Sequence, residues 1–365
     1  MKTWKKIFNL ILIPVLCLSA CADSGSREEA KAESRTSSDS SAGNSVGGSS
    51  SDTGSAMEES DVIIQDVSDQ ETDVQGYFFD TAVGLKIYGE DAHELAEGCM
   101  CICTEMENVF SAQRESSELY KVNHRTEETV EVSEDLAACL DKALDFCRRT
   151  DGAYDITVLP LTDLWDFSDH KDTVPSEKEI KEALERVDYT KVHLEGTTLV
   201  FDSADTTIDL GSAAKGYISM KLKDYLRNNG CESALIDLGH NISTVGSKTD
   251  GSHWKIGLQT PFEDSGTILD TVEVSGKCVI SSGIYERYFE EDGKIYHHIL
   301  DPQTGFPAET DLNMATIVGE DDTVCDILST VCMLLGKDKA EKFAGDIPDV
   351  RVCLTDTDNQ YQWID

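Results

Sequence analysis

The chain has 365 residues, and its 31 Lys and Arg against 70 Asp and Glu give a formal net charge of −39. This charge excludes a nucleic-acid binder, because phosphate backbones require a cationic face, and it disfavours docking on anionic lipid headgroups. A hydrophobic fraction of 39% is enough for a real core. The length suits one large domain with an appendage, or two modest domains.

The first residues have the pattern of a bacterial export signal. Lys2, Lys5 and Lys6 precede an apolar run that ends in Leu18-Ser19-Ala20-Cys21, and this run is too short to span a membrane comfortably. Small residues before a cysteine resemble a lipoprotein lipobox, which implies removal of residues 1–20 and a lipid on Cys21. The alternative is a plain signal peptide that is cut nearby. We expect a protein that is lipid-anchored at the extracytoplasmic face of the bacterial cell membrane.

The next stretch, residues 21–73, reads as a disordered linker. From Ala22 to about Ser60 it consists mostly of Ser, Gly, Ala and acidic residues and has no aromatic side chain. Such a segment buries too little surface to offset the entropy of ordering it. We therefore predict one folded domain over residues 74–365, beginning with a strand at 74–79.

Cysteine usage leaves alternatives open. Of the 12 cysteines, Cys99, Cys101 and Cys103 form a C-x-C-x-C run, which could suggest a metal. Apolar residues around them follow a helical period, so Cys101 points away from the other two and the three cannot converge on one ion. Small buried hydrophobic side chains are the favoured interpretation, and export would permit disulfides.

The predicted elements mix helices and strands without a regular βαβ alternation, which indicates an α+β domain. Helices are expected at 90–110, at 133–149, from the capping-box residue Ser176 onward, at 213–229 and at 323–335. Strands are expected at 192–194 and 198–201 as a hairpin, and then at 206–210, 234–238, 254–258, 269–274, 285–289, 295–299 and 314–318.

Two clusters with chemical potential lie where a regular element gives way to a turn. Residues 151–157 read Asp-Gly-Ala-Tyr-Asp-Ile-Thr; this loop can carry Asp155 to a binding site, or it can be a packing loop. Residues 209–217 read Asp-Leu-Gly-Ser-Ala-Ala-Lys-Gly-Tyr, with Lys215 in the first turn of a helix. Free N–H groups at a helix start bind anions, so this junction is a candidate phosphate site without P-loop spacing. The alternative is a tight turn with a solvated lysine.

Two further clusters lie in the C-terminal part. Alternation places His298 and Leu300 on one strand face before an Asp-Pro-x-Thr-Gly turn. His298 is a candidate general base, although a histidine pair is more often structural. Asp326 and Thr330 share a helical face with Ser329 alongside, and a carboxylate with hydroxyls suits Mg²⁺ that also takes phosphate oxygens. The alternative is helix-start charge with solvated hydroxyls.

In this order, and together with Ile236-Asp237-Leu238-Gly239 and Ser281-Ser282-Gly283, the clusters resemble the ApbE family of FAD:protein FMN transferases from about Phe79 to the C-terminus. The resemblance implies one large α+β domain of the ApbE, T-fold-like type. It also implies Mg²⁺-dependent transfer of FMN from FAD to a Thr or Ser hydroxyl of an acceptor flavoprotein subunit, with release of AMP. Family members are commonly exported lipoproteins.

The resemblance further implies the site residues. His298 would take the proton of the acceptor hydroxyl, with Asp301 as a nearby carboxylate. The residues expected at FAD are Phe79, Gln113, Tyr154, Asp155, Ile156, Asp209, Lys215 and Leu300, and those expected at Mg²⁺ are Ser212, Asp326, Ser329 and Thr330.

Three positions depart from the family's pattern. Phe79-Asp80-Thr81 stands for Met-Gly-Thr, Gln113 stands for a flavin-contacting tyrosine, and Gly239-His240 stands for a Gly-Gly pair. An aromatic stack lost at Gln113 would weaken FAD binding by about 1 kcal/mol. The alternatives to a transferase are a Mg²⁺-dependent FAD pyrophosphatase that yields FMN and AMP, and a non-catalytic flavin-binding lipoprotein.

Overall fold

The structure is a computed structural model that describes residues 62–167 and 172–364. The predicted signal peptide, the cysteine predicted to carry a lipid (Cys21) and most of the predicted linker lie outside the described residues. The predicted domain start at residue 74 is wrong, because β1 (Ile63–Ser68) pairs with β2 (Glu71–Phe78) in the sheet. β1 is an edge strand whose side chains are mostly exposed, so it lacks the apolar alternation that identifies a strand in a sequence.

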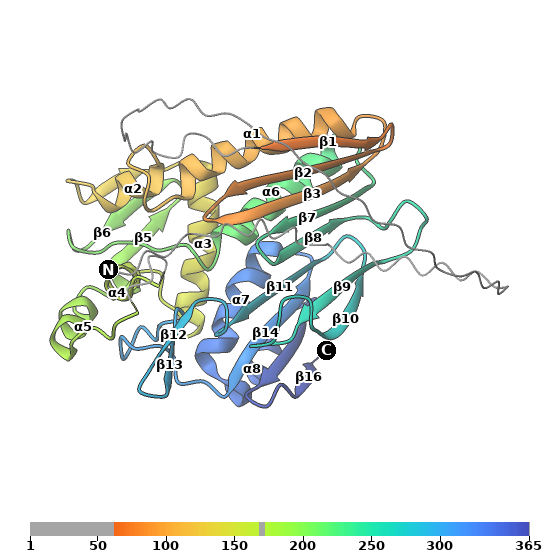
Figure 1. Ribbon diagram of the computed structural model, residues 1–365. Helices are drawn as coiled ribbons and strands as arrows, with labels where there is room; N and C mark the ends of the chain where they lie inside the picture. The colour runs from red at the N-terminus through yellow and green to blue at the C-terminus, as the bar shows by residue number, and fades with distance from the viewer. Residues whose placement is uncertain (1–61, 168–171, 365) are drawn as a thin grey trace, which may run out of the picture. The chain divides into compact units, whose positions relative to one another are not determined.

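Within the described residues, the fold is organised around a nine-stranded sheet whose neighbouring strands are all antiparallel (Figure 1). This arrangement confirms the α+β class. The sheet follows the spatial order β1, β2, β3 (Thr81–Tyr88), β7 (Ser233–Leu238), β8 (Asn241–Val245), β11 (Cys278–Gly283), β14 (Leu312–Gly319), β15 (Arg351–Asp356) and β16 (Tyr361–Ile364).

Both faces of the central strands are buried. Ala315 and Ile317 of β14 face the main core, whereas Met314 and Val318 face a second core that includes Trp254. Successive side chains of a strand point to opposite faces, and every residue of β14 is buried, including the polar Asn313 and Thr316. Helices cover the first face, and the β9–β10 hairpin (Trp254–Gln259 and Ile268–Val274) covers the second.

Three helices pack on the first face, and the second of them in chain order contacts both of the others. They are α1 (Ala92–Phe110), α6 (Ala214–Asn228) and α7 (Asp322–Leu335). The remaining elements are α2 (Glu118–Asn123), β4 (Thr129–Glu131), α3 (Glu134–Arg149), α4 (Leu159–Trp165), α5 (Glu177–Leu184), η1 (Tyr189–Lys191), β5 (Val192–Glu195), β6 (Thr198–Phe201), β12 (Tyr288–Glu291), β13 (Lys294–His297) and α8 (Lys337–Ala344).

The five predicted helices and the hairpin at 192–201 are confirmed. The predicted strand at 206–210 is wrong, because this segment is an extended loop held by the Asn123 side chain and by Ile156 rather than by a sheet. The predicted strand at 285–289 is right only at its end, where β12 begins at Tyr288. Side-chain anchors of this kind satisfy backbone groups as a ladder does, and local sequence does not distinguish the two.

Nine of the ten described cysteines are buried. Cys99 and Cys103 lie in the core and Cys101 is exposed, as the helical period predicts, and all ten described cysteines are free thiols. Burial raises the pKa of Cys103 to about 12, so this thiol stays protonated. In the part of the chain that the structure describes, no helix is long and apolar enough to cross a bilayer.

Candidate active site

The junction before α6 is built by hydrogen bonds to two distant parts of the chain and by one within its own turn. Asn123 of α2 donates to the Ile208 carbonyl and accepts from the Ile208 N–H, at 2.8 and 2.7 Å. The Asp209 N–H donates to the Ile156 carbonyl at 2.7 Å. The Asp209 carboxylate accepts from the Gly211 N–H at 2.7 Å, which closes the turn. These contacts therefore fix the position of the chain where α6 begins.

The start of α6 has features of an anion site. Its N-cap residue, Ala213, has no side chain that could bond the first N–H groups. Lys215 stands in the first turn and is half-buried. Burial raises the pKa of Asp237, Glu286 and Asp326, and charge attraction from the nearby Lys215 ammonium opposes this increase. A helix start with a free positive charge beside it favours phosphate.

Residues 154–156 are buried and contact the junction before α6, rather than lining an open surface. The buried Tyr154 hydroxyl lies 2.9 Å from the Ser212 hydroxyl. Asp155 is also buried, and its carboxylate accepts from the Thr157 N–H and hydroxyl and from the Tyr189 N–H, at 2.6 to 3.0 Å. Burial raises the pKa of Asp155, whereas these hydrogen bonds lower it. Asp155 thus fixes the loop, and Ile156 contributes its carbonyl to Asp209 and its side chain to the core.

Asp326 is the charged centre of the α7 face. Its two carboxylate oxygens accept from the Gly216 N–H at 2.8 Å and from the Asn241 amide at 2.9 Å, so α6, α7 and β8 meet at this side chain. Burial raises the pKa of Asp326, and Lys215 with the two hydrogen bonds lowers it. One turn further on, Ser329 and Thr330 lie 2.7 and 3.2 Å from the Ser282 hydroxyl of β11.

This donor set fits Mg²⁺. Among the described residues no three His, Cys, Asp or Glu side chains form a metal cage. Asp326 offers an anionic group whose two oxygens each accept only one hydrogen bond from the protein, and each oxygen retains a further lone pair. Mg²⁺ uses one or two carboxylates with substrate phosphates rather than a protein cage. Ser329 donates to the Asp326 carbonyl at 2.7 Å, so its hydroxyl oxygen keeps acceptor capacity.

The loop after β13 holds the candidate base. His298 is half-buried, and its Nδ1 lies 3.3 Å from the Arg287 carbonyl. Since a carbonyl only accepts, Nδ1 carries the proton and Nε2 has the free lone pair. Desolvation lowers the pKa of His298 to about 3, and the positive charges of Arg287 and Lys215 act in the same direction. The imidazole is therefore neutral at physiological pH and able to accept a proton.

Asp301 and Leu300 have structural contacts. The Asp301 carboxylate accepts from the Gln303 N–H at 2.9 Å and from the Thr304 hydroxyl at 3.0 Å, so it closes its own turn. Leu300 is buried in a cluster that includes Trp165, whose indole donates to the Gly305 carbonyl at 2.8 Å. These contacts favour a loop-shaping role for Asp301 over proton transfer.

Phe79 and Gln113 lie at two element ends. Phe79 has a positive φ of 54° in the β2–β3 turn, and its N–H donates to Glu107 of α1 at 3.1 Å. Burial raises the pKa of Tyr77, and the charges of Asp80 and Arg287 also act on this pKa. The β2–β3 turn therefore lies near Arg287, whose carbonyl contacts His298. Gln113 is exposed just beyond α1.

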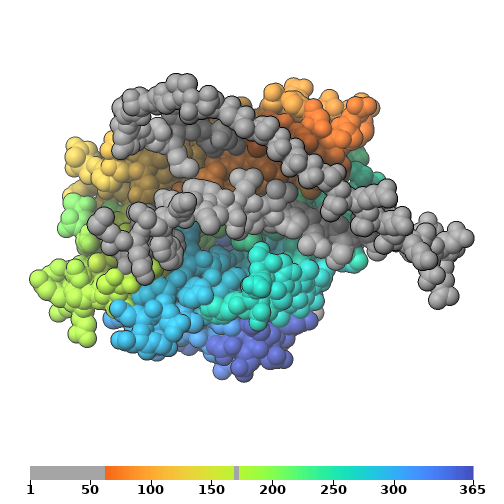
Figure 2. Space-filling model, in the orientation of Figure 1, coloured from red at the N-terminus to blue at the C-terminus, as the bar shows by residue number. Residues whose placement is uncertain are grey.

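The structure gives contacts at the site to groups for which the sequence patterns predicted no role. Asn241 holds Asp326, and Ser282 bridges Ser329 and Thr330. Desolvation raises the pKa of Glu286, which Lys215 and His240 both lower, so these charges share one neighbourhood. Figure 2 shows the 285–310 segment beside the β9–β10 hairpin on the surface. Two sequence signals could have identified Asn241 and Glu286. Asn241 directly follows the Gly-His turn, and Glu286 lies between two tyrosines.

The fold and these groups suit a protein that holds a phosphorylated ligand beside a divalent cation. The family model of the ApbE family matches residues 79–354. An FAD:protein FMN transferase from Klebsiella pneumoniae is 34% identical over 258 residues, which cover 70% of this chain and 79% of that protein. One from Treponema pallidum is 33% identical over 290 residues, which cover 74% and 80%.

Solved structures agree with these relatives. The ApbE protein from Thermotoga maritima has a TM-score of 0.73 and 31% identity, with 80% of this chain and 96% of that chain covered. The flavin transferase ApbE from Vibrio cholerae also has a TM-score of 0.73, at 26% identity and the same coverage. The chain therefore belongs to the ApbE family.

Proposed function

We propose that this chain is a Mg²⁺-dependent FAD:protein FMN transferase that moves FMN from FAD to a Thr or Ser hydroxyl of an acceptor protein and releases AMP. The observation that carries the proposal is the meeting of the α6 start with Asp326, through the Gly216 N–H at 2.8 Å. This contact places an anion-binding helix start beside a carboxylate suited to Mg²⁺. The relatives' names and the family membership agree with FMN transfer.

The chain's residues divide the work of binding and proton transfer. Lys215 and the positive end of the α6 dipole attract the FAD pyrophosphate. Asp326, with the hydroxyls of Ser329 and Thr330, would hold the metal ion, and Tyr154 orients Ser212 nearby. A bound Mg²⁺ would neutralise pyrophosphate charge and act as a Lewis acid at phosphorus. Nε2 of His298 takes the proton of the acceptor hydroxyl.

The transfer then exchanges the phosphoanhydride bond of FAD for a phosphodiester bond to the acceptor. The acceptor oxygen forms a bond to the FMN-side phosphorus, and the bond from this phosphorus to the AMP oxygen breaks. Lys215 stabilises the negative charge that develops on the departing phosphate. The product is FMN joined to the acceptor protein, and the proton remains on His298 until it exchanges with solvent.

A flavinylation assay tests the proposal. The purified protein is incubated with FAD, Mg²⁺ and an acceptor that carries a flavinylation Thr, and flavin fluorescence of the acceptor is read after denaturing electrophoresis. We expect a fluorescent acceptor with wild type and none with Asp326→Ala. An unlabelled acceptor with wild type would sink the proposal. Free FMN and AMP without acceptor would instead favour the pyrophosphatase, and tight FAD binding without turnover would favour the non-catalytic protein.

We also propose that a lipid on Cys21 holds the enzyme at the extracytoplasmic face of the bacterial membrane. The support is the basic start, the short apolar run and the small residues before Cys21. We expect an alkyne fatty acid fed to expressing cells to label wild type but not Cys21→Ala. Equal labelling of the two proteins would contradict the assignment.

A further inference from the structure

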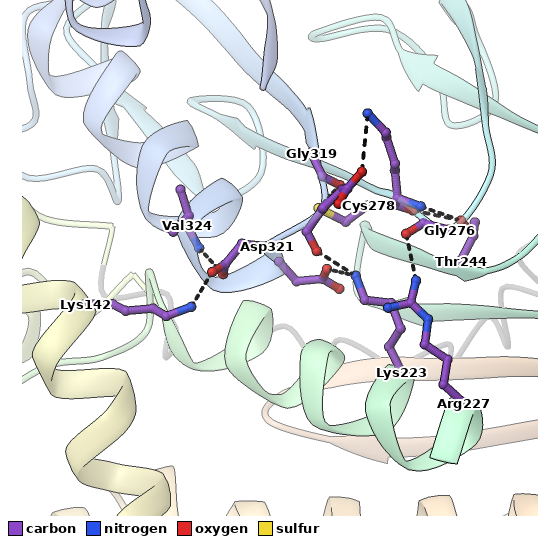
Figure 3. A network of polar contacts seen from close by, with 12 residues as sticks. Lys142, Lys223, Arg227, Thr244, Gly276, Cys278, Gly319, Asp321 and Val324 are labelled. Carbon is purple, nitrogen blue, oxygen red and sulfur yellow. Dashed lines mark hydrogen bonds and ion pairs between the residues drawn. The ribbon is translucent and has the colours of Figure 1, made fainter. Parts of the chain in front are cut away.

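A buried ion pair links α6 to the first turn of α7. The Lys223 ammonium bonds Oδ1 of Asp322 and donates to the Glu320 carbonyl at 3.0 Å. The two side chains are 1% and 0% exposed, and they lie 99 positions apart in the sequence. Figure 3 shows Lys223 reaching from α6 toward the turn that starts α7.

Stability alone does not account for this pair. Removing two charges from water costs about as much as their attraction returns, so two apolar side chains of similar volume would serve equally well. Oδ2 of Asp322 and the Thr323 hydroxyl have no hydrogen-bond partner among the described atoms, which adds to the cost. An ion pair differs from an apolar contact in one respect: it fixes where the two partners sit relative to each other.

The pair belongs to a two-point contact between the helices. Seven positions before Lys223, on the same side of α6, Gly216 packs directly on α7: a Cβ at Gly216 would lie 2.4 Å from the Asp322 carbonyl oxygen and 2.6 Å from Cβ of Asp326. The Gly216 N–H also donates to Asp326 at 2.8 Å. Two contacts two turns apart fix both the rotation and the sliding of α7 against α6.

A second contact holds the same end of α7 from the other side. Asp321 caps the helix by accepting from the Val324 N–H at 3.1 Å, and its other oxygen bonds Lys142 of α3. Figure 3 shows both contacts at this turn. Lys142 and Asp321 are partly exposed, however, so solvent weakens this pair relative to the buried one. The buried pair is therefore the better shielded of these two ion pairs at the start of α7.

We propose that Lys223 and Asp322 form a positioning pair that aims the Asp326 carboxylate at the metal. Asp322 lies one turn before Asp326 on α7, so a rotation of this turn moves the carboxylate away from Asn241 and Gly216. The inference rests on the proposed function, since it requires that Asp326 bind the metal. Mutation of a group that orients a metal ligand typically lowers metal affinity by about 10- to 100-fold.

The test measures metal binding directly. Mn²⁺ replaces Mg²⁺ as a paramagnetic probe, and its binding to the full-length protein with FAD is titrated by electron paramagnetic resonance. Lys223→Met should raise the Mn²⁺ dissociation constant by about tenfold or more, with FAD affinity in the absence of metal almost unchanged. Lys223→Arg keeps the charge and should recover most of the affinity. Lys86→Met, which breaks a partly exposed pair with Asp73 in the sheet, is the matched control and should bind Mn²⁺ as wild type does.

Each outcome is decisive. A folded Lys223→Met protein with wild-type Mn²⁺ affinity would overturn the positioning role. If Lys223→Met does not fold, the double variant Lys223→Met with Asp322→Asn, which leaves no buried charge unpaired, takes its place and should show the same weakened binding; wild-type affinity there would also overturn the role. If wild type itself binds no Mn²⁺, the metal assignment of the proposed function fails, and the positioning role fails with it.

Discussion

At the scale of single residues, the contacts of His298 suit a chemical role, whereas those of Asp301 suit a structural one. The Nε2 lone pair of His298 is free, whereas the Asp301 carboxylate is used within its own turn. We expect His298→Gln to lower the rate of FMN transfer by about two to four orders of magnitude, which is the usual contribution of a general base. Asp301→Asn should cost far less. If the two variants lost comparable amounts of single-turnover rate, Asp301 would also have to take part in proton transfer.

The low pKa of His298 also predicts the pH dependence of transfer. With a pKa of about 3, the imidazole of the free enzyme stays neutral through the range in which an ordinary histidine titrates. The anionic pyrophosphate of bound FAD favours the imidazolium and raises this pKa. We expect the acid limb of kcat/KM to lie below pH 5, and that of kcat to lie higher. An acid limb of kcat/KM near 6.5 that disappears in His298→Gln would show that the imidazole is not shielded.

Gln113 offers a gain-of-affinity test. The residue is exposed, and the resemblance of the sequence implies a flavin-contacting tyrosine at this position, where an aromatic stack would contribute about 1 kcal/mol. Gln113→Tyr should therefore lower the FAD dissociation constant by about fivefold, as measured by quenching of flavin fluorescence. Gln113→Leu controls for apolar surface without a ring and should change it less. No change with tyrosine would place residue 113 away from the isoalloxazine.

At the scale of elements, the helices could be predicted because their signals are local. The Ser133 and Ser176 side chains accept from the Leu136 and Glu179 N–H groups, and these caps lie within three residues in the sequence. The edge strand β1 and the loop at 206–210 could not be predicted, because their partners are decided by distant residues such as Asn123. The motifs identified Lys215, His298 and Asp326, but not Asn241, whose role appears only when β8 meets α7.

The contact between α6 and α7 predicts an unusual cost for a helix-favouring change. Alanine in place of Gly216 would gain about 1 kcal/mol in helix propensity. Its Cβ would nevertheless lie below 3.0 Å from the Asp322 carbonyl oxygen and from Cβ of Asp326, so the helices must separate. We expect a net loss of about 1 to 3 kcal/mol in urea unfolding, together with weaker Mn²⁺ binding.

A second helical glycine supplies the control for this prediction. Gly98 of α1 would meet the hydroxyl end of the Tyr225 side chain, which can rotate away, so Gly98→Ala should cost less than Gly216→Ala. Equal unfolding free energies for the two variants would show that the α6–α7 contact yields without strain.

At the scale of the whole molecule, the two adjacent histidines make the fold sensitive to acid. His297 is buried, its Nε2 donates to the Ala308 carbonyl at 3.2 Å, and burial lowers its pKa to about 4. The unfolded chain binds this proton at about pH 6.5, so the contribution of His297 is complete above pH 6.5 and is lost as the pH falls toward 4. The loss approaches about 3 kcal/mol at pH 4, with a slope of about 1.4 kcal/mol per pH unit.

His297→Gln retains a donor for the Ala308 carbonyl but cannot bind this proton. The free energies of urea unfolding of wild type and variant, measured at pH 7, 5.5 and 4.5, should therefore converge as the pH falls. The slope for wild type should be steeper by the amount that corresponds to about one extra proton bound on unfolding. The buried carboxylates of Asp155 and Asp326, whose raised pKa values act in the opposite sense, are common to both proteins and cancel in the difference. Parallel pH curves for the two proteins would mean that the fold opens locally and lets His297 titrate as it does in the unfolded chain.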